Sequence, residues 1–137
     1  MKRLAAATLC LLLASPASAA GDVYGNWVTE DRSAIVSLQH CGAGVCGRIA
    51  KVLVHRPGHP TTDVNNPDPK LRKRPVEGLL ILSGFVRNGD RWDNGRIYDP
   101  EGGKSYKSKL KLNGDGSLTV SGCISVFCRS QRWVRAR

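Results

Sequence analysis

The sequence predicts an all-β protein, built as a single small antiparallel up-and-down β-barrel of about eight strands with one long proline-rich loop. Apolar side chains recur at every second position in several short segments, and Gly, Pro, Asn or Asp bound each segment. No window shows a sustained helical stripe of apolar residues. Because short antiparallel strands leave unpaired edges unless their sheet closes, we expect a barrel and not an open sheet.

The clearest strands form a hairpin in the last third of the chain. Lysines alternate with serine and leucine over 107–112, which predicts a strand with its lysines toward water, and 118–121 alternates in the same way. Asn113-Gly114-Asp115-Gly116 between them supplies residues that tolerate a positive φ. Asn88-Gly89-Asp90 predicts a second such turn. The remaining strands are expected at 23–29, 34–39, 47–54, 79–87, from 91 onward and at 130–135.

The segment 79–85 is apolar on both faces of the expected strand. Leu79, Ile81 and Phe85 point one way by alternation, and Leu80 and Leu82 point the other. A strand of this kind is covered outside as well as inside. Either a packed loop or a homodimer partner would supply that cover.

The loop 55–77 interrupts the strand pattern. It holds Pro57, Pro60, Pro67, Pro69 and Pro75, a density that forbids a regular strand or helix. Loops this long in compact domains are binding loops, lids or disordered insertions. We favour an ordered cover over one barrel mouth, with a disordered insertion as the alternative.

The first residues resemble an export signal. Lys2 and Arg3 precede the apolar run 4–14, and Ala17-Ser18-Ala19 offers a small-residue cleavage site. We therefore expect residues 1–19 to be a cleaved signal peptide and 20–137 to be one domain, periplasmic or secreted. No later run approaches the roughly 20 apolar residues of a membrane helix, so no transmembrane segment is expected.

The charge balance favours anionic surroundings. The formal net charge of +10 falls to +8 when Lys2 and Arg3 are removed. Such an excess attracts lipid headgroups and other anionic envelope surfaces over a distance that salt shortens, although it can equally serve solubility alone. Because the chain is expected to be exported, no nucleic-acid partner is expected.

Four cysteines form two matching frames, Cys41 with Cys46 and Cys123 with Cys128. Four intervening residues let both cysteines of a frame face each other across a hairpin, and an exported protein meets an oxidising compartment. Two local disulfides are the favoured interpretation. Pairing between frames and a four-thiolate zinc site are the alternatives, the latter disfavoured because such sites usually use C-x2-C spacing. We expect no metal and no cofactor.

A catalytic site does not emerge from the sequence. His55 and His59 are four residues apart, but Pro57 and Gly58 between them exclude the helix on which that spacing makes a metal site. No Ser-His-Asp or Cys-His arrangement stands out once the cysteines are paired. A hydrolase is therefore a minor alternative, and the protein is expected not to be an enzyme.

The most suggestive polar cluster runs from Tyr98-Asp99 through Lys104 to Tyr106. The two tyrosines are expected on adjacent strands facing one mouth, with a cationic rim for a carboxylate or phosphate supplied by Lys104 and by Arg48 or Arg74. The alternative is structural, because Asp-Pro and Gly-Gly in this segment also shape a wide hairpin turn.

Two resemblances follow from these motifs. Gly25-Asn26-Trp27 on the first strand with Arg132 and Arg135 on the last resembles the mark of lipocalins and their calycin relatives, in which an arginine lies on the indole and closes the barrel. A resemblance over nearly the whole mature chain is to the bacterial exported domains grouped as domain-of-unknown-function family 2147. It is carried by Gly25-Asn26-Trp27, the first cysteine frame with Gly47-Arg48-Ile49, Asp63 with Asn66-Pro67, Arg74-Pro75 with Gly78, Gly95 to Pro100, Gly103 to Tyr106, and Gln131-Arg132-Trp133. This resemblance implies a lipocalin-like barrel in the cell envelope and brings no reaction or ligand.

Together these observations predict an exported, non-enzymatic binder of a small amphipathic or apolar ligand in the barrel mouth. The main alternative is a basic envelope-associated protein that contacts anionic polymers, lipid headgroups or a protein partner. The two differ in whether the barrel is hollow or filled by its own side chains.

Overall fold

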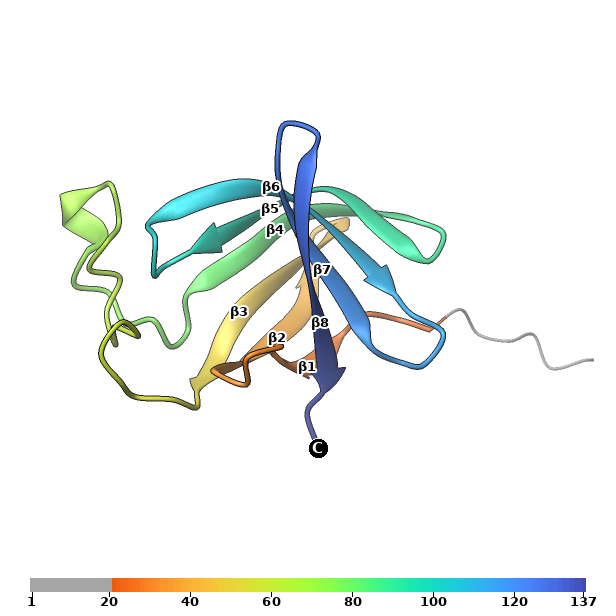
Figure 1. Cartoon of the computed structure of the whole chain (residues 1–137). Helices are drawn as coiled ribbons and strands as arrows, with labels where there is room; N and C mark the ends of the chain where they lie inside the picture. The colour runs from red at the N-terminus through yellow and green to blue at the C-terminus, as the bar shows by residue number, and fades with distance from the viewer. Residues whose placement is uncertain (1–20) are drawn as a thin grey trace, which may run out of the picture.

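The computed structural model describes residues 21–137, and the expected signal peptide lies outside them (Figure 1). Eight antiparallel strands form a closed barrel in sequence order, which confirms the predicted fold class. The strands are β1 Gly25–Val28, β2 Ala34–Cys41, β3 Gly44–Val52, β4 Leu80–Asn88, β5 Arg91–Asp99, β6 Lys104–Leu112, β7 Leu118–Ile124 and β8 Phe127–Arg135. One short 3-10 helix, η1 at Pro69–Leu71, interrupts the loop between β3 and β4.

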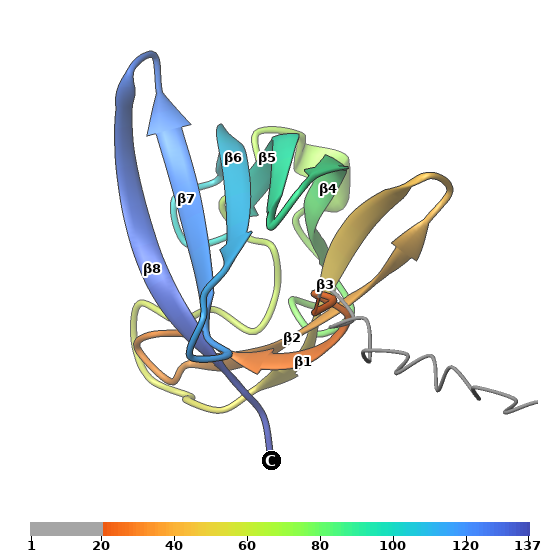
Figure 2. The same ribbon diagram turned by 90° about the vertical axis from the view of Figure 1, so that its right-hand side faces the viewer.

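Closure of the barrel depends on a short contact between its first and last strands. Only Trp27 with Arg135 and Val28 with Val134 pair between β1 and β8. The rest of β8 pairs with β7 alone, and the β7–β8 hairpin projects from the barrel, as Figures 1 and 2 show. Pairing of β7 with β6 ends at Cys123, so the turn beyond that residue stands free of β6.

Arg135 seals the closed end of the barrel. Its guanidinium lies 4.2 Å from the centroid of the Trp27 ring and donates hydrogen bonds to the carbonyls of Asp22 and Tyr24. Of the two arginines expected at this place, Arg132 lies elsewhere, because its guanidinium donates to Asp115 Oδ2 at 2.7 Å. A cation on the indole face therefore joins the last strand to the first strand and to the residues just before it.

Apolar side chains fill the interior at the closed end. Both tryptophans of the closure, Trp27 and Trp133, are fully buried, and the largest side chains packed with them are Leu38, Leu82, Phe85, Leu110 and Leu118. A space lined by Val36, Ile49, Ile81 and Ile97 remains toward the other end. The barrel is thus neither fully hollow nor fully filled.

Strand β4 departs from strict alternation. Leu80 and Leu82 pair with consecutive residues of β3, so Ile81 is an extra residue in a β-bulge. A second register shift follows around Gly84, whose φ is 76°. The bulges bury both Ile81 and Leu82, whereas Leu80 is exposed. The expectation that Leu80 and Leu82 share an outer apolar face is therefore wrong. Because Leu82 is buried inside the barrel, the outer face of β4 no longer needs the cover that the sequence predicted.

Both predicted local disulfides, Cys41–Cys46 and Cys123–Cys128, are confirmed. Each joins the two ends of a hairpin turn, β2–β3 in the first case and β7–β8 in the second. In an up-and-down barrel these two turns lie at opposite ends. Among residues 21–137, no helix has the length and apolar character needed to cross a bilayer.

Candidate functional site at the barrel mouth

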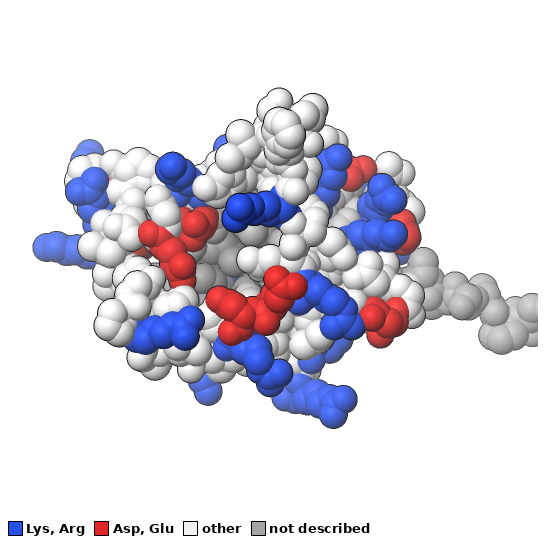
Figure 3. All heavy atoms as spheres, viewed as in Figure 1, with Lys and Arg blue, Asp and Glu red and all other residues white. Residues whose placement is uncertain are grey.

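A cavity of about 300 Å³ opens at the end of the barrel opposite Arg135. The β1–β2, β3–β4 and β5–β6 connections surround it, and Figure 3 shows the hollow with acidic side chains along its border. Its walls are apolar and come from four neighbouring strands and the loop, namely Val36, Ile49, Val76, Ile81 and Ile97. The packed layer below forms its floor.

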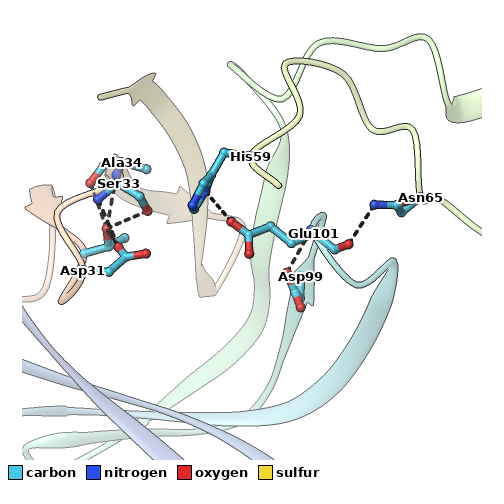
Figure 4. A network of polar contacts seen from close by, with 8 residues as sticks. Asp31, Ser33, Ala34, His59, Asn65, Asp99 and Glu101 are labelled. Carbon is cyan, nitrogen blue, oxygen red and sulfur yellow. Dashed lines mark hydrogen bonds and ion pairs between the residues drawn. The ribbon is translucent and has the colours of Figure 1, made fainter. Parts of the chain in front are cut away.

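The rim of the cavity is polar and mainly acidic. Asp31 lies on the β1–β2 connection, and Asp99 and Glu101 lie at the β5–β6 connection. Figure 4 shows His59 pointing toward Glu101, with 2.5 Å between His59 Nδ1 and Glu101 Oε1, while Asp31 lies on the opposite side. Burial opposes ionisation of Asp31, but hydrogen bonds from Ser33 and Thr29 outweigh it, so the pKa of this carboxyl is below its ordinary value. The rim therefore carries negative charge.

The loop 55–77 is folded against the β5–β6 side of the mouth. Asn65 Nδ2 donates to the Glu101 carbonyl at 2.7 Å, and His59 pairs with the side chain of the same residue. Gly103 lies so close that an added Cβ would be 1.9 Å from the Asn65 carbonyl oxygen. A residue larger than glycine at position 103 would therefore push the loop away. We call the loop 55–77 the lid, because His59 and Pro60 on it line the cavity.

Asp63 is the buried centre of the lid. Its side chain is 0% exposed and accepts hydrogen bonds from Tyr98 Oη at 2.6 Å, Asn66 Nδ2 at 2.7 Å and Arg74 Nε at 2.8 Å. Burial raises the pKa of Asp63, but these three donors together outweigh it and hold the pKa below its usual range. Burial and the Asp63 carboxylate raise the pKa of Tyr98 to about 12, so its hydroxyl remains a donor at neutral pH. Tyr98 on β5 thus fixes the lid to the barrel wall.

The residues predicted as a site separate into two groups. Tyr98 and Asp99 line the cavity, and Tyr106 lines a groove beside it. The three predicted cationic residues line neither space. Arg48 donates to the Gly78 carbonyl at 3.0 Å, Arg74 is held by Asp63, and Lys104 is exposed on β6. The rim is accordingly acidic where the sequence predicted a cationic one.

The adjoining groove extends the mouth along the inner face of the β7–β8 hairpin. Ile97, Asp99 and Gln131 belong to both spaces, so the groove is continuous with the cavity. Its further walls are Tyr106 on β6 and a mainly apolar set on the hairpin, Val120, Ile124, Phe127 and Arg129.

Among the described residues, the mouth shows neither a metal-binding cluster nor a paired nucleophile and base. Within 21–137, no group of three or more His, Cys, Asp or Glu side chains is placed to hold a metal ion. His59 and Glu101 have the relation of a base and its orienting acid, yet among the described residues no hydroxyl or thiol is hydrogen-bonded to His59. The four described cysteines are all in disulfides, so none supplies a thiolate nucleophile.

Sequence reasoning missed the lid anchor and the acidic rim. From the sequence, Asp63 and Asn66 are given only as parts of a family motif and Arg74 is expected at a cationic rim, although three hydrogen-bonding residues in a proline-rich loop are typical of an internally satisfied turn. Nothing in the pattern signalled Asp31 and Glu101, because connections carry no period from which a side chain's direction follows.

Comparisons with known proteins agree with this architecture. A comparison with curated protein sequences gives no match. Among solved structures, the chain is similar to protein HP1028 from the human pathogen Helicobacter pylori, described as belonging to the lipocalin family, with a TM-score of 0.76 and 19% identity over 85% of this chain and 84% of that one. The family of uncharacterized proteins conserved in bacteria known as DUF2147 matches residues 25–135. The chain therefore belongs to the DUF2147 family and has a lipocalin-like barrel.

Proposed function

We propose that the protein is an exported, non-enzymatic binder of a small amphipathic or apolar ligand, which enters the mouth of the barrel. The observation that supports this most is the half-filled interior, with a cavity of about 300 Å³ above a packed apolar floor. Small-molecule pockets span roughly 300–1,000 Å³, are mostly apolar and carry a few polar groups that orient the ligand. The mouth has this composition at the lower end of that range.

The polarity of the mouth indicates how such a ligand lies. Its apolar part would contact the walls formed by Val36, Ile49 and Ile97, and its polar part would lie at the rim. Because Asp31, Asp99 and Glu101 accept hydrogen bonds and carry negative charge, a hydrogen-bond donor or a cationic group fits there better than a carboxylate or phosphate. This reverses the ligand chemistry that the sequence predicted.

The disulfides and the signal-like first residues both bear on where the protein is located. The two disulfides indicate an oxidising environment outside the cytoplasm. We further propose the periplasm or the medium as the protein's location, because residues 1–19 resemble a cleaved signal peptide.

Titration with the apolar fluorescent amine N-phenyl-1-naphthylamine tests the proposal. Binding to the wild type should raise the probe's fluorescence, and Ala34→Phe, which places a ring in the cavity, should weaken binding at least tenfold. Val86→Phe is the matched control, because Val86 is exposed on β4 and lines neither space. Equal affinities of the two variants, with both folded by thermal melting, would contradict a ligand site in the cavity. Native mass spectrometry of protein isolated from its own envelope then shows whether a natural ligand leaves on denaturation.

A further inference from the structure

The β7–β8 turn carries the most exposed apolar side chains of the described chain. Ile124, Val126 and Phe127 are 67%, 83% and 79% exposed, whereas the next large apolar residue, Val86, is 55% exposed. These three lie within four residues, and the Cys123–Cys128 disulfide closes the turn directly behind them. We call residues 124–127 the tip. Figure 3 shows it as an uncharged protrusion.

The fold does not require apolar residues at this turn. The β4–β5 and β6–β7 turns use glycine and polar residues, Asn88-Gly89-Asp90 and Asn113-Gly114-Asp115-Gly116. In the tip, Ser125 takes a positive φ of 54° and Val126 follows it. Two-residue hairpin turns favour Gly, Asn or Asp, so turn geometry does not account for Val126 and Phe127. Apolar surface that is exposed together in this way marks a contact with a partner.

Basic side chains lie beside the tip on the outer face of the barrel. Arg96 on β5 pairs with Lys107 on β6, and Lys107 pairs with Cys123 at the base of the tip. Lys107, Lys109 and Arg96 form one surface with Ser125 and Val126. The acidic residues of the mouth line the cavity instead, away from this surface. An apolar tip next to cations complements a surface that is apolar inside and anionic at its boundary.

We propose that the tip docks the protein on a lipid bilayer rich in anionic phospholipid, with Val126 and Phe127 entering the acyl region and the basic residues contacting phosphates. Each Lys or Arg near such a surface strengthens binding by about 1 kcal/mol, or roughly fivefold, and apolar side chains add the free energy of leaving water. The disulfide keeps the tip extended before contact, so little conformational entropy is lost on docking. The groove beside the tip would then open at the bilayer surface.

A bilayer fits the tip better than a second copy of the chain does. A standard protein interface removes about 800 Å² per partner from water, and a four-residue turn offers much less. A bilayer needs no complementary shape and accepts a narrow projection. This inference does not depend on ligand binding in the cavity, so either proposal can fail without the other.

A tryptophan placed in the tip reports insertion directly. The three native tryptophans, Trp27, Trp92 and Trp133, are all buried, so Val126→Trp adds one exposed indole to a constant background. With vesicles of 30% phosphatidylglycerol in phosphatidylcholine, its emission should shift to the blue and bromine-labelled acyl chains should quench it. Neither change should occur with pure phosphatidylcholine. An indole that stays exposed to water on anionic vesicles would overturn the proposal.

Cosedimentation with the same vesicles measures the two contributions. Val126→Ser with Phe127→Ser should weaken binding at least about tenfold. Lys107→Ser should weaken it about fivefold, and Lys111→Ser, at the far end of the same strand, much less. All variants are compared as the chain from residue 20 onward, so that the apolar run at 4–14 does not itself bind the vesicles. If the tip variants bind vesicles as the wild type does, or if they instead dissociate a dimer seen without vesicles, the bilayer is the wrong partner.

Discussion

The lid and the tip border the same mouth but are stabilised in opposite ways. The lid is rich in polar residues, and its central carboxylate has three hydrogen-bond donors while 0% exposed. The tip is apolar, largely exposed and constrained by a single disulfide. Polar groups that are hydrogen-bonded within the fold, as in the lid, indicate a structural role. Apolar side chains left exposed to water, as in the tip, indicate a surface that binds a partner.

Of the changes that test this contrast, the loss of the Asp63 carboxylate should lower the free energy of unfolding most. Asp63→Ala leaves the Tyr98 hydroxyl and the Arg74 guanidinium without their acceptor, which should cost about 3 kcal/mol, reduced from the value for a fully buried pair because Arg74 is partly exposed. Urea unfolding measures the change. Asp68→Ala, which removes only the exposed cap of η1, is the control and should cost about 1 kcal/mol or less. Equal costs would show that the lid is not anchored through Asp63.

The next prediction distinguishes the contribution of the tip's disulfide to vesicle binding from its contribution to the stability of the barrel. Each disulfide closes a loop of the same length, with a sequence separation of 5, so Cys123→Ser with Cys128→Ser and Cys41→Ser with Cys46→Ser should each lower the free energy of unfolding by about 2 kcal/mol. Only the first pair should also weaken binding to anionic vesicles. A loss of vesicle binding with both pairs would mean that general stability, and not the shape of the tip, governs docking.

The smallest expected effect is on the pH dependence of stability. The contribution of the lid should change with pH, and that of the tip should not. The pKa of Asp63 is lower in the folded state than in the unfolded chain, so its contribution to stability is fully present above the unfolded value of about 3.9 and is lost as the pH falls toward the folded value. The difference in unfolding free energy between wild type and Asp63→Asn should therefore be larger at pH 7 than at pH 3. The difference between wild type and Val126→Ser should be near zero at both values. A constant difference for Asp63→Asn would mean that the carboxylate gains nothing from its partners.

Much of the barrel could be predicted from the sequence because strands obey a period of two. The lysine alternation in β6 and the Asn-Gly turns placed the hairpins, and the spacing of the cysteines placed the disulfides. The same rule misplaced Leu82, because a bulge inserts one residue and turns the next side chain to the other face.

The site was harder to predict, since its polar residues lie on connections. Arg48 was expected at the rim, but its guanidinium is bound to the Gly78 carbonyl, while Asp31 and Glu101 reach the rim from turns without any period. The exposure of Phe127 depends on how far β7 and β8 run past β6, and alternation within one strand contains no information about its neighbour's end.

The pairing of β1 with β8 also limits when the barrel can close during synthesis. The Arg135 guanidinium contacts carbonyls 111 and 113 residues earlier in the chain, and only two residue pairs hold the first strand to the last. While Arg135 is still inside the ribosome, the barrel cannot close, even if the earlier hairpins have already formed. We therefore expect closure between β1 and β8 to be the last step in forming the barrel on a nascent chain.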